Sequence, residues 1–160
     1  EQSALPVVVD ADALNLLAQN PTSSDRWILT PHPGEAARLL DQTTEQVQAD
    51  RYYAVSQLQQ RYGGVAVLKG AGTLVQAADT ITALCSAGNP GMASGGMGDV
   101  LSGVLGGLLA QKHSLLEAAE IGVMVHSMAA DHAAEQGGER GLLATDVLQQ
   151  LRLLVNPDDT

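Results

Sequence analysis

The chain has 160 residues, 45% of them hydrophobic, which is enough for one compact domain and too few for two. Its formal net charge is −10 and it holds only eight Lys and Arg, so nucleic acid is not expected as a partner. Cys85 is the single cysteine, which excludes an internal disulfide and favours the reducing cytoplasm. The most apolar run, residues 100–110, is far shorter than the ~20 residues of a membrane span, so no membrane contact is expected.

Strand and helix patterns alternate through the first half of the chain. Residues 6–10 form a short β-branched run, which is typical of a strand buried on both faces of a parallel sheet. The pattern from Thr43 to about Arg61 predicts one long helix that the glycine pair at 63–64 stops. The other expected elements are helix 13–19, strand 27–30, a helix from Glu35, strand 65–68, and strands 73–76 and 80–84, which could form a hairpin.

The second half of the chain is expected to be helical. Helices are predicted over residues 100–111, 115–135 and 146–154, with Thr145 as the N-cap of the last one. Strands that alternate with helices and then give way to helices indicate the α/β class.

The segment from Asn89 to Asp99 carries the strongest chemical signal. It has four glycines in its last nine residues and leads directly into an apolar helical run. Glycines let backbone N–H groups converge on an anion, and the helix dipole adds positive potential at the same point. A carboxylate beside such a site suits a general base that takes a proton from a hydroxyl attacking phosphorus. The alternative is that Asp99 is an ordinary helix-start charge behind a flexible loop.

Better-known motifs do not fit this segment. The chain contains no Gly-x-x-x-x-Gly-Lys-Ser/Thr sequence, and Leu101 stands where a dinucleotide fingerprint starting at Gly96 needs its third glycine. Ser94 lacks the glycine that a nucleophile elbow requires before it. Phosphoryl transfer therefore remains the favoured chemistry for this segment, whereas P-loop, redox and serine-hydrolase chemistry are disfavoured.

Polar residues also follow three of the expected strands. Lys69 and the flexible residues up to Thr73 come directly after strand 65–68, where open α/β sheets bind ligands, although such a segment is equally typical of a plain turn. His32 lies between two prolines after strand 27–30, and could contact a ligand or simply be exposed. Asp10 and Asp12 follow the first strand, and could assist a magnesium ion or a ribose hydroxyl, or serve the turn.

With these pieces in order, the chain resembles the C-terminal part of the ADP-dependent NAD(P)H-hydrate dehydratase family, a branch of the ribokinase-like superfamily. The resemblance runs from Pro6 to about Leu154 and implies a three-layer α/β/α fold with a mostly parallel sheet. Residues 1–160 would then be the C-terminal portion of one such domain, without the N-terminal part of the fold. The matching motifs are Val9-Asp-Ala-Asp-Ala-Leu14, Leu29-Thr-Pro-His-Pro-Gly-Glu35, Val67-Leu-Lys-Gly70 and Asn89-Pro-Gly-Met-Ala-Ser-Gly-Gly-Met-Gly-Asp-Val-Leu-Ser-Gly103.

The resemblance implies repair of NADH or NADPH whose nicotinamide ring has been hydrated. The ring hydroxyl would attack the terminal phosphorus of ADP and release AMP, and loss of phosphate would then restore the reduced dinucleotide. ADP is the implied co-substrate and Mg²⁺ the expected ion, with no metal ligand assigned in the chain. The implied roles are Asp99 as base and substrate contact, His32 as substrate contact, Gly96, Met97 and Gly98 as the phosphate loop, and Lys69, Gly70, Ala71, Gly72, Thr73 and Gly98 as the nucleotide site.

Two other functions remain open. An ATP-dependent kinase of a small hydroxylated metabolite would use the same glycine-rich turn, and a non-catalytic nucleotide-binding module would need no base. The dehydratase is preferred because residues 30–35 and 89–93 match together. The chain runs almost at once into a strand pattern, so we expect it to be part of a larger protein, and many family members are fused to an N-terminal epimerase domain. A homo-oligomer is also expected, because a truncated sheet leaves an edge to cover.

Overall fold

Short β-branched runs form a five-stranded sheet in the computed structural model, which describes residues 5–156. The strands lie in the order of the chain, and β1 to β3 pair in parallel. Strand β4 is antiparallel to both of its neighbours, so β5 runs in the same direction as the first three strands. The bounds are β1 (Val7–Val9), β2 (Trp27–Leu29), β3 (Val65–Leu68), β4 (Thr73–Gln76) and β5 (Ala83–Cys85).

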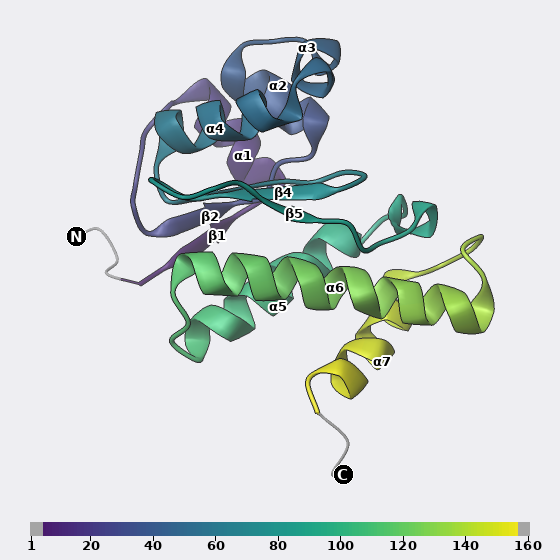
Figure 1. Ribbon diagram of the computed structural model, residues 1–160. Helices are drawn as coiled ribbons and strands as arrows, with labels where there is room; N and C mark the ends of the chain where they lie inside the picture. Colours follow the sequence, from purple (N-terminus) through teal and green to yellow (C-terminus); the bar gives the residue numbers. More distant parts are fainter. Residues whose placement is uncertain (1–4, 157–160) are drawn as a thin grey trace.

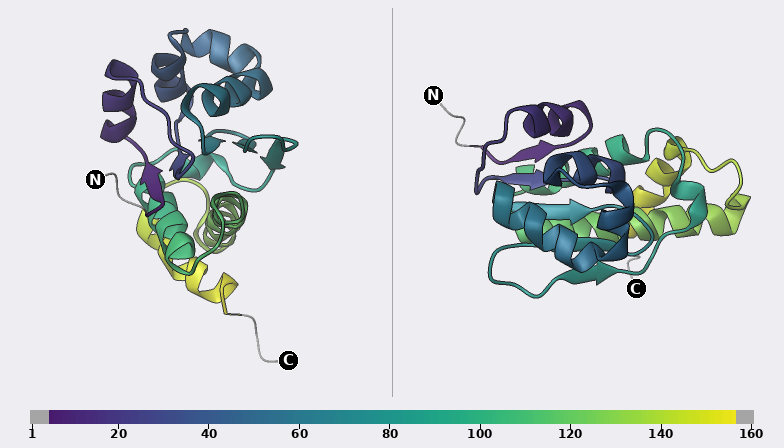
Figure 2. Two further views of the ribbon diagram at one scale, coloured as in Figure 1. Left: turned by 90° about the vertical axis from the view of Figure 1, so that its left-hand side faces the viewer. Right: turned by 90° about the horizontal axis from the view of Figure 1, so that it is seen from above.

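Helices cover both faces of the sheet and give the three layers visible in Figures 1 and 2. One face carries α1 (Asp12–Gln19), α2 (Pro33–Leu40), α3 (Thr44–Ala49) and α4 (Arg51–Tyr62). The other face carries α5 (Met97–Ala110) and α6 (Leu115–Gly137), and α7 (Ala144–Leu154) packs on α6. A 3₁₀ turn at Pro90–Met92 precedes α5. This architecture confirms the predicted α/β/α class with a mostly parallel sheet.

Strand β3 shows why apolar side chains pack on both faces of the sheet. All four of its residues are buried, as its unbroken apolar run predicts. Because side chains alternate along a strand, Ala66 and Leu68 pack toward α1–α4, while Val65 and Val67 pack toward α5 and α6. The buried valine and leucine side chains contribute about 1.5–3 kcal/mol each, so the central strand anchors both layers.

Several predicted boundaries differ from those of the structure. The single helix expected over residues 43–61 is two helices, because the Asp50 carboxylate accepts the Tyr53 N–H (2.9 Å) and caps a new helix. The last helix begins after Leu143, not after Thr145, and the Asp146 carboxylate accepts the Leu143 N–H (2.9 Å). The hairpin is confirmed, but its second strand starts at Ala83 instead of residue 80.

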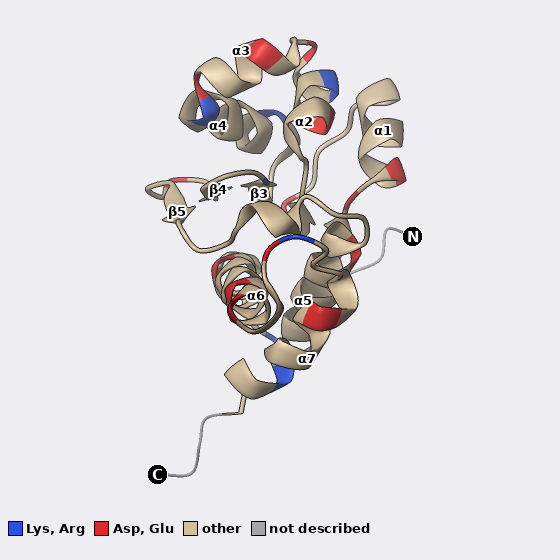
Figure 3. Cartoon of the chain, turned by 90° about the vertical axis from the view of Figure 1, so that its right-hand side faces the viewer, with Lys and Arg blue, Asp and Glu red and all other residues tan. Residues whose placement is uncertain are grey.

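Charge is spread over the molecule. Figure 3 shows acidic positions on α1, α3, α5 and α6, with basic positions few and scattered. This distribution matches a formal charge of −10 built from 18 acidic and eight basic residues. Among residues 5–156, no helix is both long enough and apolar enough to cross a membrane.

Candidate functional site

The carboxyl ends of β1, β2 and β3 lie at one edge of the sheet, and α5 begins beside them. Asp10, His32 and Lys69 follow these three strands, so residues far apart in the chain meet there. A Cβ built on Gly98 would lie 3.3 Å from Asp10 Oδ2 and 3.4 Å from Lys69 Nζ. The start of α5 therefore touches the strand-edge pair, and the structure brings together Lys69 and Gly98.

Lys69 is held by an ion pair. Its Nζ donates to Asp10 Oδ1 at 2.8 Å, and Ser102 of α5 donates to Asp10 Oδ2 at 3.0 Å. Burial by itself would raise the pKa of Asp10, but the charge and hydrogen bonds of Lys69, with those of Thr30 and Ser102, outweigh it and hold that pKa below its usual value. Asp10 is therefore an anion that fixes a lysine at the strand edge.

A second carboxylate lies near the same lysine. Glu35 is buried, its Oε2 accepts the His32 N–H at 2.8 Å, and the same oxygen lies 4.0 Å from Lys69 Nζ. The site thus places two carboxylates within 4.0 Å of one amine. This buried negative charge beside Lys69 was not anticipated from the sequence, which shows Glu35 only as a helix-start acid.

His32 lies at the sheet edge where it was expected, and it also caps α2. Its Nδ1 accepts the N–H groups of Gly34 (3.0 Å) and Glu35 (3.3 Å). The side chain is 52% exposed and its Nε2 lies 3.5 Å from Glu35 Oε1. The cap fixes the orientation of the imidazole, while half of its surface stays open to a ligand.

The glycine-rich turn is fastened to α6. Asp131 accepts the Gly88 N–H at 2.8 Å and the Asn89 side-chain amide at 2.9 Å, and Asn89 in turn accepts the Gly91 N–H at 3.0 Å. Gly96 adopts φ +88°, and a Cβ there would lie 3.1 Å from Ala144 Cβ, so glycine is required at this point. Asp131 had not been singled out in the sequence, because it lies inside a helical pattern.

Helix α5 starts earlier than predicted, at Met97, so Asp99 lies within its first turn. The Met97 side chain is buried against Ala130 and its neighbours on α6, which leaves only its backbone to line the predicted phosphate loop. Asp99 is exposed and makes no side-chain hydrogen bond or ion pair with the rest of the described chain. A carboxylate without a partner among residues 5–156 therefore stands at the positive end of a 14-residue helix.

His126 of α6 lies beneath the start of α5. It is 5% exposed, and its Nε2 has no hydrogen-bond partner within residues 5–156. The pKa of His126 is lowered to about 4, mainly because burial disfavours the charged imidazolium. The positive charge of Lys69 lowers this pKa further, whereas a hydrogen bond to the Met97 backbone raises it. A neutral imidazole thus supports the start of α5, a placement that the sequence pattern did not indicate.

The residues of this site do not form a metal cage. No group of three or more His, Cys, Asp or Glu side chains that could hold an ion occurs among residues 5–156. Asp10 already accepts from Lys69 and Ser102 with its two oxygens. Mg²⁺ bound here would depend on phosphate oxygens and water, as is common for this ion.

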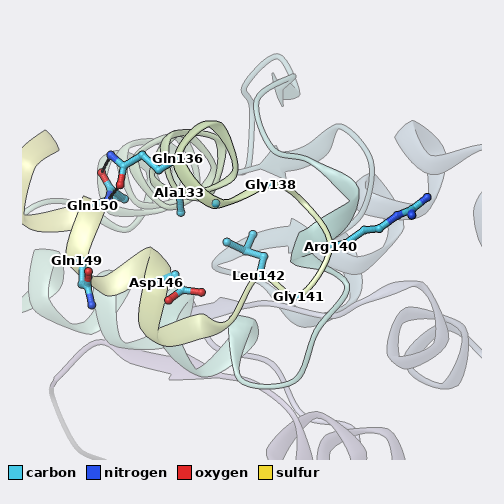
Figure 4. A pocket seen from close by; sticks show the side chains of 10 residues that line it. Ala133, Gln136, Gly138, Arg140, Gly141, Leu142, Asp146, Gln149 and Gln150 are labelled. Carbon is cyan, nitrogen blue, oxygen red and sulfur yellow. Dashed lines mark hydrogen bonds between the residues drawn. The ribbon is translucent and has the colours of Figure 1, made fainter.

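A hollow of about 260 Å³ lies elsewhere, between the end of α6 and α7 (Figure 4). The side chains of Gln136 and Gln150 come together at one end of it, at 3.0 Å, away from Arg140. None of the predicted site residues lines this hollow. Its loop does support the glycine-rich turn from behind, because Ser94 donates to the Leu142 carbonyl at 3.0 Å.

Together, the three-layer α/β/α fold and the glycine-rich turn beside the lysine at the end of β3 define a protein of the ribokinase-like superfamily. The family model for NAD(P)H-hydrate dehydratase matches residues 1–153, and the chain belongs to that family.

Relatives and solved structures agree with this placement. The bifunctional NAD(P)H-hydrate repair enzyme Nnr of Coxiella burnetii is 60% identical over 156 residues, which are 98% of this chain and 32% of that protein. The ADP-dependent (S)-NAD(P)H-hydrate dehydratase of Neisseria meningitidis is 45% identical over 163 residues, which cover 98% of this chain and 55% of that protein. This chain therefore spans between about a third and about half of the length of these relatives.

A crystal structure of the ADP/ATP-dependent NAD(P)H-hydrate dehydratase of Bacillus subtilis, co-crystallised with ATP/Mg²⁺, matches with a TM-score of 0.82 and 29% identity. The match covers 92% of this chain and 53% of that one. The hydroxyethylthiazole kinase of Pyrococcus horikoshii shares the fold with a TM-score of 0.73 at 16% identity.

Proposed function

We propose that the protein to which this chain contributes dehydrates hydrated NADH or NADPH, with ADP as the co-substrate. The observation that carries the proposal is the free Asp99 carboxylate in the first turn of α5, one residue after Gly98, which lies against Lys69. A base, a set of backbone N–H groups and a cation thus occur together at the start of α5. The names of the relatives specify the substrate pair.

In the proposed reaction, the hydroxyl oxygen of the hydrated ring attacks the terminal phosphorus of ADP. Asp99 accepts the hydroxyl proton, and AMP leaves with the bridging oxygen. Backbone N–H groups of Gly96, Met97 and Gly98 stabilise the charge on the transferred phosphoryl group, which is the main task in such transfers. The phosphorylated ring then loses phosphate and a proton, which restores the double bond of NADH or NADPH.

The remaining site residues bind the two substrates. Lys69 meets the phosphates of the nucleotide from the strand edge, where Asp10 holds it, and the exposed face of His32 contacts the dinucleotide. The nucleotide segment comprises Lys69, Gly70, Ala71, Gly72 and Thr73, with Gly98 opposite. Mg²⁺ binds together with the nucleotide. The crystal structure of the Bacillus subtilis dehydratase, which was co-crystallised with ATP/Mg²⁺, supports this part of the proposal.

The proposal extends to the organisation of the parent protein. Residues 1–160 form the C-terminal portion of its dehydratase domain, and a second, epimerase domain precedes that domain. The bifunctional name of the Coxiella burnetii relative and the 32% of its length that the chain covers support this arrangement. The proposal also includes a cytoplasmic homo-oligomer. Assembly is supported by the apolar side chains exposed along α6, namely Ile121, Met124 and Met128. Sedimentation velocity would test the oligomeric state.

The deciding experiment supplies hydrated NADH or NADPH to the intact parent protein with either ADP or ATP. The expected result is recovery of the absorbance of the reduced nicotinamide, with one AMP formed for each ring restored when ADP is used. No recovery with either nucleotide would overturn the proposal. A phosphorylated metabolite that accumulates with ATP would instead indicate a kinase.

Asp99→Asn separates an enzyme from a binding module. The amide cannot accept the proton, so we expect turnover to fall by at least about 100-fold while ADP binding stays within a few-fold of wild type. Glu120→Gln, an exposed position on α6, serves as the control for the loss of one negative charge. Unchanged turnover in the Asp99 variant would remove the proposed base.

A further inference from the structure

Arg51 reaches from the start of α4 to the loop that follows β3. Its Nη1 donates to the carbonyl of Ala71, and its Nη2 donates to the carbonyls of Leu68 (3.2 Å) and Lys69 (3.4 Å). One guanidinium therefore holds the carbonyl of the last residue of β3 and two carbonyls of the loop that links β3 to β4. The planar fork of arginine suits this task, because it presents several donors in a fixed geometry.

These bonds fix the direction of two N–H groups. In a planar trans peptide the N–H points away from the carbonyl of the same unit, and residues 5–156 contain no cis peptide. The Lys69 carbonyl shares its peptide unit with the Gly70 N–H, and the Ala71 carbonyl shares its unit with the Gly72 N–H. Since both carbonyls face Arg51, both N–H groups face away from it.

The two N–H groups are free to bind a ligand. Neither Gly70 N–H nor Gly72 N–H makes a hydrogen bond within the described part of the chain, whereas the Lys69 N–H donates to Pro31 O at 2.9 Å. Both glycines are at least partly exposed. Two free backbone donors next to a lysine at a strand edge form a set that accepts anionic oxygens.

The loop conformation itself depends on Arg51. Gly70 adopts φ +144°, and a Cβ there would lie 3.0 Å from Arg51 Nη2, so only glycine allows the guanidinium to approach. The Nε of Arg51 is buried without a partner among residues 5–156. A buried unpaired donor lowers stability, so a role in helix packing alone does not account for the arrangement.

We propose that Arg51 is a positioning residue for the nucleotide site: it binds the loop from behind and turns the N–H groups of Gly70 and Gly72 toward the phosphate oxygens of the nucleotide. Arg51 itself does not touch the nucleotide. The identity of the ligand rests on the proposed function, whereas the orientation of the loop does not. Lys69 supplies the positive charge that attracts the phosphate, and the two N–H groups supply hydrogen bonds that orient it.

The test compares Arg51→Gln and Arg51→Lys with Arg61→Gln in the intact parent protein. Arg61 is an exposed arginine at the other end of α4, so its variant controls for the loss of one positive charge. Calorimetric titration with ADP is expected to show about tenfold weaker binding for Arg51→Gln, several-fold weaker for Arg51→Lys, and a change below about twofold for Arg61→Gln. In turnover assays of Arg51→Gln, the KM for ADP should rise, while kcat should stay within a few-fold of the wild-type value.

A merely structural role predicts a different pattern. It would lower the melting temperature of Arg51→Gln and leave the ADP affinity and KM of the folded protein unchanged, and that result would overturn the proposal. Gly70→Ala displaces the guanidinium while Arg51 remains, so it should weaken ADP binding similarly. The double variant should then lose little more than either single one, because both changes remove the same interaction.

Crystal structures of the ligand-free wild type and Arg51→Gln judge the loop independently of any nucleotide. We expect the peptide units 69–70 and 71–72 to rotate in the variant; an unchanged loop would overturn the proposal. If the wild type bound neither ADP nor ATP, the proposed function would fail, and these two structures would still decide whether Arg51 sets the loop.

Discussion

Lys69 and Asp10 are 59 positions apart in the sequence and form an ion pair with 2.8 Å between Nζ and Oδ1. Their side chains are only 20% and 13% exposed. In its degree of burial, the pair is therefore intermediate between the weak ion pairs of protein surfaces and the costly ion pairs of protein interiors. It links the ends of β1 and β3 and places the lysine amine next to Gly98.

Asp10→Asn should weaken both the fold and the nucleotide site. The variant leaves Lys69 without its counter-ion in a partly buried place, so we expect the free energy of unfolding to fall by about 1–3 kcal/mol. Urea denaturation would measure this, and ADP titration should show weaker binding because the amine is no longer fixed. Asp12→Asn, an exposed neighbour in the first turn of α1, should lose less than about 1 kcal/mol. Equal losses for the two variants would contradict a specific role for the ion pair.

Burial of His126 makes stability depend on pH in a defined window. Its pKa is about 4 in the folded protein, against 6.5 for an ordinary histidine. Above pH 6.5 the imidazole is neutral in both states, so this group has no effect there. As the pH falls from 6.5 to about 4, only the unfolded chain binds the proton, and the free energy of unfolding should fall by about 3 kcal/mol.

Denaturation curves across this window, recorded for His126→Gln, would test the assignment. Glutamine has no titrating group, so the slope between pH 6.5 and 4 should shrink even if the absolute stability of the variant is lower. His132→Gln, six positions further along α6, is the matched change of a second histidine on the same helix. Asp10 acts in a lower window, because a lowered carboxyl pKa costs stability only as the pH falls below about 3.8. A wild-type slope in His126→Gln would show that another group titrates.

The sequence predicted those parts of the site that depend on local patterns. The buried run 65–68 followed by Lys69 indicated a strand end with a lysine, and the glycines before α5 indicated a turn at a helix start. Both patterns act over a few residues, where backbone preferences and burial decide the structure. The predicted roles of Asp99 and His32 in binding and catalysis stay predictions until the experiments are done.

Contacts between distant elements could not be predicted in the same way. Arg51 lies in an ordinary helical pattern, and its three carbonyl partners are 17 to 20 positions away. His126 also lies in an ordinary helical pattern, and its place under Met97 depends on how α6 packs on α5. The break at Asp50 has a similar cause, because a helical pattern alone does not show whether an aspartate caps a helix or lies within one.

Gly98→Ala should separate helix stability from nucleotide binding. Alanine favours a helix over glycine by up to about 1 kcal/mol, but the added Cβ would lie 3.3 Å from Asp10 Oδ2 and 3.4 Å from Lys69 Nζ. We therefore expect little loss in melting temperature and a clear loss of ADP affinity. Gly106→Ala is the matched change on the same helix, where a Cβ meets nothing within 4 Å, and it should stabilise the protein without changing affinity. Unchanged ADP binding in Gly98→Ala would place the nucleotide elsewhere.

Asp131 should matter for the glycine-rich turn although it lies on α6 behind it. Asp131→Ala removes the acceptor of the Gly88 N–H and of the Asn89 amide, and hydrogen bonds to a charged group contribute about 1.5–3 kcal/mol each. Since Asn89 also holds the Gly91 N–H, the whole start of the turn should loosen. Hydrogen exchange over residues 88–96 should therefore become faster, and ADP affinity should fall. Glu135→Gln, an exposed position one turn further along α6, should change neither quantity. If Asp131→Ala exchanged and bound ADP like the wild type, the turn would keep its shape through its own glycines and the contact with Leu142, and α6 would have no part in forming the site.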